Sequence, residues 1–183
     1  MIGGLRLKFF LVDLNLFLIL FRSFQRVRAK ERSQPVVPLQ FEDLFVPFPE
    51  KYTTTADGDN FLLMKDLVSE NSDAAMVMFM SPFGRQLLQS SKFWLADGTF
   101  WTAPHPFTQI YLINALASTG RVLPACYCLL PNKDTESYSR MWESVKFSLS
   151  NNNQFSPDVL KVDFELASIN AFRTSFPNSK VTA

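Results

Sequence analysis

Apolar and polar positions in the second half of the chain form a pattern that predicts three consecutive strands. These strands are expected over residues 93–101, 108–117 and 122–130. Short polar segments join them, for example the turn sequence Ser-Thr-Gly at 118–120. Strands joined by such short connections pair in antiparallel fashion. The pattern therefore predicts a three-stranded antiparallel meander.

After the meander the apolar spacing changes to the helical period. Asp134 can cap a helix whose apolar face would be formed by Tyr138, Met141, Trp142, Val145 and Leu149. A short apolar strand over 159–162, a second helix ended by Pro177 and a strand starting at 180 should follow. Because helical crossovers join parallel strands, the order predicts a mixed α/β sheet with helices on its faces.

The segment before the meander carries shorter signals. An Asp-Gly pair at 57–58 predicts a turn between β-forming residues 52–55 and apolar residues 61–64, so we expect a two-stranded hairpin. Residues 75–80 predict a further strand, and residues 83–88 predict a helical turn.

The first 34 residues differ in character from the rest of the chain. The apolar run Phe9–Phe21 is shorter than the about 20 residues that span a bilayer, and it contains Asp13. No small-residue cleavage site follows it. Three interpretations stay open: a helix buried on the domain, a poor signal-anchor, or an extension foreign to the fold. The abrupt change at Arg22 favours the last, and residues 22–34 are expected to form a solvated linker rather than a DNA-binding arm.

Composition excludes several classes of protein. The 18 Lys and Arg residues nearly balance the 17 Asp and Glu residues, so no global field favours nucleic acid or membrane. An apolar fraction of 47% argues against wholesale disorder. With two cysteines and one histidine, a disulfide framework and a four-cysteine zinc site are excluded. Cys126 and Cys128 are expected to pack as small hydrophobic residues.

Two carboxylates stand at unusual positions. Asp97 lies inside an apolar strand and Asp163 ends another, and buried carboxylates are costly unless they are paired or bind a metal. If the two strands are neighbours, both side chains can reach one point and offer the oxygen ligands that Mg²⁺ or Mn²⁺ prefers. Spacing alone favours the alternative, in which Asp97 and Gly98 form a turn or bulge and Asp163 caps a helix.

Longer motifs surround these acids. The sequence reads WLADGTF at 94–100, LLPNK at 129–133 and VDFE at 162–165. With the apolar and proline-rich segment upstream, these motifs resemble the transposase domain of Mutator-like elements, the MULE family, over about residues 35–183. Several motifs in family order make the resemblance specific, whereas a lone DGTF would not.

The resemblance implies a ribonuclease-H-like fold and DDE chemistry. Asp97 and Asp163 match the first and second catalytic acids, which with a third acid would hold Mg²⁺ or Mn²⁺ for DNA strand cleavage and transfer. Glu165 is expected to face the helix surface or to lie behind the metal ligands. The implied partner is DNA at transposon ends, and the implied location is the nucleus. A membrane partner is not expected, and anchoring through residues 9–21 is the alternative.

The family's third acid lies on a later helix, beyond a Cys-x-x-His element, and the sequence ends at Ala183 before both. We therefore interpret residues 92–183 as a ribonuclease-H-like core truncated at the C-terminus. Residues 35–91 would be a family-like N-terminal extension, and residues 1–34 a hydrophobic head with a basic linker. The chain is interpreted as a partial or domesticated transposase domain, inactive as presented, and its status as an enzyme stays open. The alternatives are a non-catalytic DNA- or protein-binding remnant and a partial gene model of a longer active transposase.

Other side chains near the acids allow two interpretations each. Trp94, Trp101 and Phe107 could form a base-stacking platform, but their strand and loop positions favour packing in the core. His105 is expected in an exposed loop, and Lys133 could meet a phosphate or remain solvated.

Overall fold

The computed structural model describes residues 47–66, 75–150, 155–163 and 165–182, all within one compact unit, Pro38–Ala183. The apolar run at 9–21 and the basic linker at 22–34 lie outside the described residues. Within the described ranges, no helix has both the length and the apolar character needed to cross a membrane.

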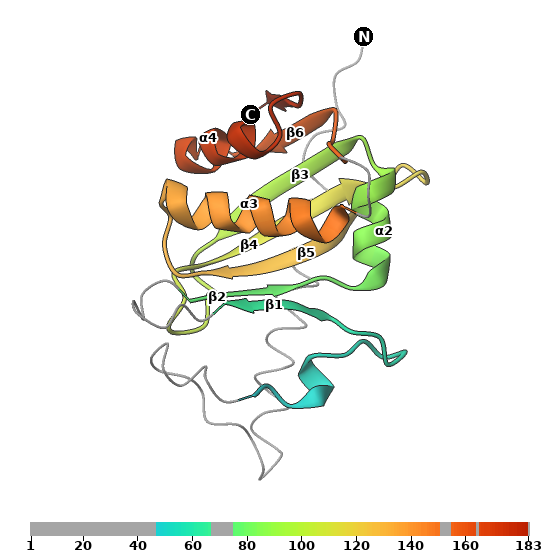
Figure 1. Ribbon diagram of the computed structural model, residues 1–183, viewed down its shortest axis with the longest axis vertical. Helices are drawn as coiled ribbons and strands as arrows, with labels where there is room; N and C mark the ends of the chain where they lie inside the picture. Colours follow the sequence, from blue (N-terminus) through green and yellow to red (C-terminus); the bar gives the residue numbers. More distant parts are fainter. Residues whose placement is uncertain (1–46, 67–74, 151–154, 164, 183) are drawn as a thin grey trace. The chain divides into compact units, whose positions relative to one another are not determined.

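The described strands form one mixed sheet in the order β1-β2-β5-β4-β3-β6-β7 (Figure 1). The strands are β1 (Leu62–Asp66), β2 (Met76–Phe79), β3 (Phe93–Thr99), β4 (Gln109–Leu116), β5 (Val122–Leu130), β6 (Val159–Val162) and β7 (Lys180–Thr182). The helices are the 3-10 helix η2 (Glu50–Tyr52) and the α-helices α2 (Pro82–Ser90), α3 (Thr135–Leu149) and α4 (Leu166–Ser175). This arrangement confirms a mixed α/β fold.

The predicted meander is present as β3, β4 and β5. β3 pairs with β4, and β4 with β5, in antiparallel fashion. The crossover through α3 then places β6 parallel to β3, and the crossover through α4 places β7 parallel to β6. The short turns and the long helical connections thus produce the strand directions that the sequence predicts.

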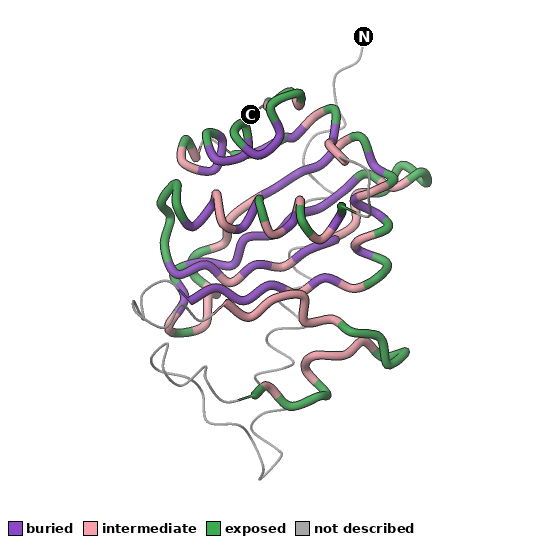
Figure 2. Tube along the Cα trace, in the orientation of Figure 1, coloured by how far each residue is buried: buried purple, intermediate pink, exposed green. Residues whose placement is uncertain are grey.

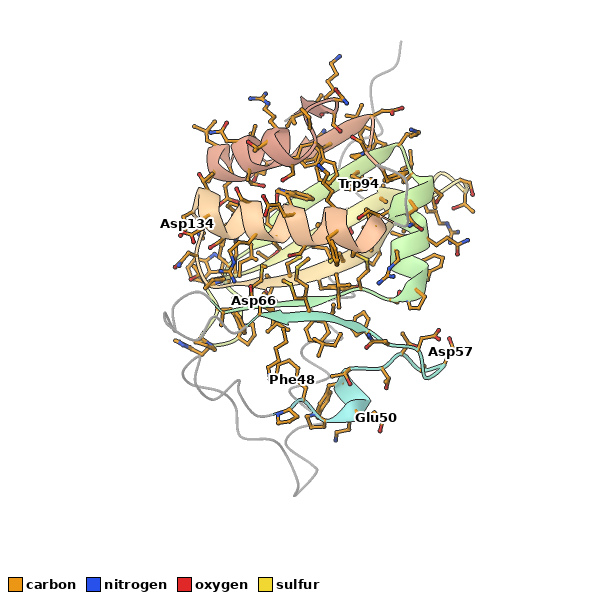
Figure 3. The ribbon with its side chains drawn as sticks, in the orientation of Figure 1. Phe48, Glu50, Asp57, Asp66, Trp94 and Asp134 are labelled. Carbon is orange, nitrogen blue, oxygen red and sulfur yellow. The ribbon has the colours of Figure 1, made fainter. Side chains whose placement is uncertain are left out.

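Helix α3 begins and packs as its sequence indicates. The Asp134 side chain accepts a 2.7 Å hydrogen bond from the backbone N–H of Ser137 at the start of the helix (Figure 3). The five apolar residues of its predicted stripe are all buried. Phe172 of α4 and Phe176, directly after that helix, stack with ring centroids 4.9 Å apart, and Trp142 of α3 meets Phe172 edge to face at 5.0 Å.

Helices α2, α3 and α4 pack against one face of the sheet, where the central strands and the inner faces of the helices are buried (Figures 1 and 2). Trp94 of β3 lies fully buried in this core (Figure 3). Cys126 and Cys128 of β5 are buried there too, with their sulfurs 3.7 Å apart, as expected for small apolar residues. Helix α2 approaches β5 so closely that a Cβ atom at Gly84 would lie 2.2 Å from the Ala125 carbonyl oxygen.

The predicted hairpin upstream is right in its turn and wrong in how far its pairing extends. Gly58 lies in the turn at φ 85°, and the two arms meet through the bridge Thr54–Asn60 and through the hydrogen bond from the Phe61 N–H to the Thr53 carbonyl, 2.7 Å long. Beyond this short hairpin the apolar segment becomes β1 and pairs with β2. Pairing with β2, which is mostly buried, lets Met64 pack against the core, which a two-stranded ribbon could not provide.

The predicted core position of Trp101 is also wrong. β3 ends at Thr99, two residues before the predicted end of the strand, and the Trp101 side chain is 99% exposed. Trp94 and Phe107 are buried as expected.

Candidate active site

The parallel ladder between β3 and β6 brings the two predicted acids together. Ala96 and Val162 are partners in this ladder, and an aspartate follows each of them: Asp97 within β3 and Asp163 directly after β6. Because parallel strands end at the same edge of a sheet, the two carboxylates come from neighbouring strand ends. The sequence alone left this neighbour relationship open.

The two acids line one cleft of about 320 Å³. A third carboxylate, Glu165, lines it as well, rather than facing the outer helix surface. The remaining lining residues are small or aromatic: Ala96, Gly98, Phe100 and Tyr111. The cleft therefore combines a concentration of negative charge with an apolar wall.

The alternative local roles of the two aspartates are wrong. Asp97 continues the regular β3–β4 register opposite Leu112, with no bulge at that point. The N-cap of α4 is Glu165, and it makes no side-chain capping hydrogen bond, so Asp163 is not the cap. Neither aspartate takes the turn, bulge or cap position that would explain it structurally.

The surroundings of Asp97 in the cleft raise the pKa of its carboxyl group. Burial raises the pKa of the Asp97 carboxyl, a backbone hydrogen bond from Gly98 lowers it, and the charges of Asp163 and Glu165 raise it further. The ionised form is therefore disfavoured by lost hydration and by like charge. A cation placed among these groups would offset the like charge and favour the ionised carboxyl.

A buried polar layer lies between the sheet and the helices beside the cleft. Gln109 of β4 donates a 2.5 Å hydrogen bond from its Nε2 to the Tyr138 hydroxyl of α3. The hydroxyl groups of Tyr111 and Ser168 lie 2.6 Å apart. Burial raises the pKa of both tyrosines, and for Tyr138 an interaction with the Glu165 carboxylate raises it further, so both hydroxyls stay protonated.

Sequence reasoning missed this layer, although one signal was present. Gln109 is one of two amide residues in the mostly apolar strand β4, and it is fully buried. Its Oε1 atom has no hydrogen-bond partner among the described residues and would lie 2.7 Å from a Cβ atom at Gly98. The glycine of the DGTF motif therefore gives the Gln109 side chain its space.

Other predicted residues lie at the edge of the cleft or away from it. Lys133 is exposed, and its ammonium sits 3.2 Å from the centroid of the Phe100 ring. His105 is exposed in the loop between β3 and β4. Among the described residues, no group of three or more His, Cys, Asp or Glu side chains is arranged to hold a metal ion.

Comparison with models of protein families matches residues 93–183 to the MULE transposase domain. Residues 93–183 belong to this family. The MULE domain match begins at the first residue of β3 and includes Asp97, Asp163 and Glu165. Comparisons with curated proteins and with solved structures gave no match.

Membership of the MULE family connects the cleft to a general function. A MULE transposase domain suggests a role related to transposition, and with it a general dependence on divalent metal and on DNA. Both aspartates of the cleft fall within the matched part of the chain.

Proposed function

We propose that residues 92–183 form the core of a DDE-type transposase domain whose chemistry is metal-dependent cleavage and transfer of DNA strands. The observation that carries this proposal is the pairing of Asp97 and Asp163 at the ends of two adjacent parallel strands, in one cleft. In this proposal both aspartates are metal ligands, residues 35–91 are an N-terminal extension of the domain, and the substrate is nuclear DNA at transposon ends.

The strand order supports a ribonuclease-H-like assignment. Five strands run β5-β4-β3-β6-β7 across the sheet, with the antiparallel meander first and the two parallel strands after it. This is the order that the resemblance implies for the fold. It places the first acid on the central strand of the five and the second acid directly after the strand beside it.

The residues present fit a hard divalent cation. The cleft offers carboxylate oxygens, and burial together with the neighbouring charges disfavours an ionised Asp97 when no cation is near. Bound Mg²⁺ or Mn²⁺ would supply activation of the attacking oxygen and stabilisation of the leaving oxygen of a phosphodiester. The protein's own contribution is to hold Asp97 and Asp163 on rigid strand ends and to keep Glu165 beside Tyr138.

A second candidate is a non-catalytic DNA-binding domain. It is favoured by the absence of a metal-holding group of three side chains among the described residues. In that case DNA binding should persist without any divalent cation and should not depend on Asp97.

The deciding experiment measures nicking of supercoiled plasmid by the full chain with Mg²⁺ or Mn²⁺, alongside calorimetric binding of Mn²⁺ alone. Asp97→Asn and Asp163→Asn should each weaken Mn²⁺ binding at least 10-fold and abolish any nicking that the wild type shows, because each removes one charged ligand. Glu143→Gln, an exposed carboxylate on α3, is the matched control and should change neither measurement.

Two results would contradict the catalytic proposal. One is nicking that continues unchanged in Asp97→Asn. The other is a wild-type chain that binds DNA but neither binds Mn²⁺ nor nicks, and that result would establish the non-catalytic candidate in its place.

A further inference from the structure

Trp101 stands out on the surface beside the cleft. Its side chain is 99% exposed, whereas Trp94 and Trp142 are fully buried. A tryptophan gains more from burial than almost any other residue, so a fully exposed indole beside a candidate active site is informative. Trp101 directly follows Phe100, which lines the carboxylate cleft. The exposed indole therefore belongs to the residue that directly follows the wall of the cleft in the chain.

The loop that carries Trp101 is held in place at both ends. The backbone N–H of Ala103 donates to the Phe100 carbonyl at 3.2 Å, and that of Phe107 donates to the Pro104 carbonyl at 2.9 Å. Phe107 is buried, and Thr108 donates from its backbone to the Leu130 carbonyl at 2.9 Å. A loop fixed in this way presents the indole at little further entropic cost when a ligand binds.

A cation lies over the ring of Phe100, the residue before Trp101. Lys133 of the β5–α3 loop places its ammonium 3.2 Å from the centroid of the Phe100 ring. Phe100 is itself 40% exposed and lines the cleft, so the ammonium and the Phe100 ring lie at the rim of the cleft, and Trp101 is the next residue along the chain. An aromatic face combined with a cation is the chemistry that binds unpaired nucleic acid, through base stacking and phosphate contact.

We infer that Trp101 stacks on an unpaired DNA base adjacent to the cleaved phosphodiester, while Lys133 contacts the DNA backbone. The inference rests on the proposed function, because that function makes DNA the molecule in the cleft. It goes further by requiring a base with a free face. Bases inside a duplex are stacked on both sides, so the ring should bind single-stranded or frayed DNA more tightly than blunt duplex.

The test measures binding of the full chain to short fluorescently labelled DNA in the presence of a chelator, so that no metal chemistry contributes. Trp101→Ala should weaken binding to single-stranded DNA roughly 10-fold, the loss expected for one stacked base. Trp101→Phe should recover most of that affinity because it keeps an aromatic face. Phe147→Ala removes another exposed aromatic ring, 84% exposed on α3, and should bind as the wild type does.

Intrinsic fluorescence gives an independent reading. Since Trp94 and Trp142 are buried, quenching by added DNA should come from Trp101 and should disappear in Trp101→Phe. Lys133→Gln should lower the salt dependence of binding, because one phosphate contact is lost.

The outcomes separate this inference from the proposed function. If Trp101→Ala binds single-stranded DNA as tightly as the wild type does, the stacking inference is refuted. The proposed function is then unaffected, because it is tested by nicking that depends on Asp97. Tighter binding of RNA of the same sequence would refute the choice of DNA. If the wild type binds neither single-stranded nor duplex DNA, both the inference and the proposed substrate fail.

Discussion

Gln109 of β4 and Tyr138 of α3 are joined by a 2.5 Å hydrogen bond from the Gln109 Nε2 to the tyrosine hydroxyl. Tyr138 in turn interacts with Glu165 in the cleft. The pair thus connects the sheet, helix α3 and a carboxylate of the candidate site through buried polar groups. Buried networks of this kind are stabilising when their members are satisfied and costly when one member is removed.

Tyr138→Phe should destabilise the protein by about 1–3 kcal/mol, because it leaves the buried Gln109 amide without its acceptor. Urea unfolding of the variant measures this loss. In the double variant Gln109→Leu with Tyr138→Phe, both polar partners are replaced by apolar groups, so most of the stability should return. A double variant less stable than Tyr138→Phe would contradict this account.

Gly84→Ala should cost about 2–4 kcal/mol and lower the Tm, because an added Cβ would overlap the Ala125 carbonyl at 2.2 Å and force α2 away from β5. The control is Gln86→Ala on the exposed face of the same helix, which should stay within about 0.5 kcal/mol of the wild type. Equal Tm values for the two variants would show that α2 can shift without loss.

Asp97→Asn should stabilise the protein at neutral pH even though it removes the proposed metal ligand. Burial, followed by the charges of Asp163 and Glu165, raises the pKa of Asp97. Between the unfolded and folded pKa values the native state holds more protons, so wild-type stability falls as the pH rises through the folded pKa. The Tm of the variant should therefore exceed the wild-type Tm at pH 7. This difference should vanish by about pH 4, near the ordinary aspartate pKa. An advantage that grows on acidification would contradict this assignment.

Asp134→Ala should destabilise the protein by about 1 kcal/mol, because the Ser137 N–H at the start of α3 loses its acceptor. Asp134→Asn keeps a capping oxygen and should retain most of the stability. Thermal unfolding of the two variants side by side makes the comparison, and equal losses would indicate that charge rather than capping matters.

Local patterns predicted the regular elements because their causes are local. The helical spacing of Tyr138 and Trp142, with the cap at Asp134, specifies α3, and the short turns specify the antiparallel pairs of the meander. The pairing of β1 with β2 was missed because the gain comes from burial in a distant core. The exposure of Trp101 was missed because strand and core positions were inferred from apolar character alone.

In the candidate site, the sequence could identify the acidic residues but not the side chains that lie next to them. Asp97 and Asp163 were identified by their place in apolar strands and by the family resemblance, and the β3–β6 register brings them to one edge of the sheet. The roles of Gln109 and Glu165 depend on which side chains they meet across elements, and no spacing rule along the chain encodes that. Contacts of this kind appear only once the sheet and helices have been assembled.

The β3–β6 ladder also bears on the order of folding. The meander pairs strands that follow one another in sequence, whereas the ladder joins residues 93–96 to residues 159–162 across the whole of α3. Closing a longer loop costs more entropy before its contacts form, so we expect the meander to assemble first and β6 to dock later. The two carboxylates then meet only in that late step, and their mutual repulsion is absent from every earlier species on the folding route.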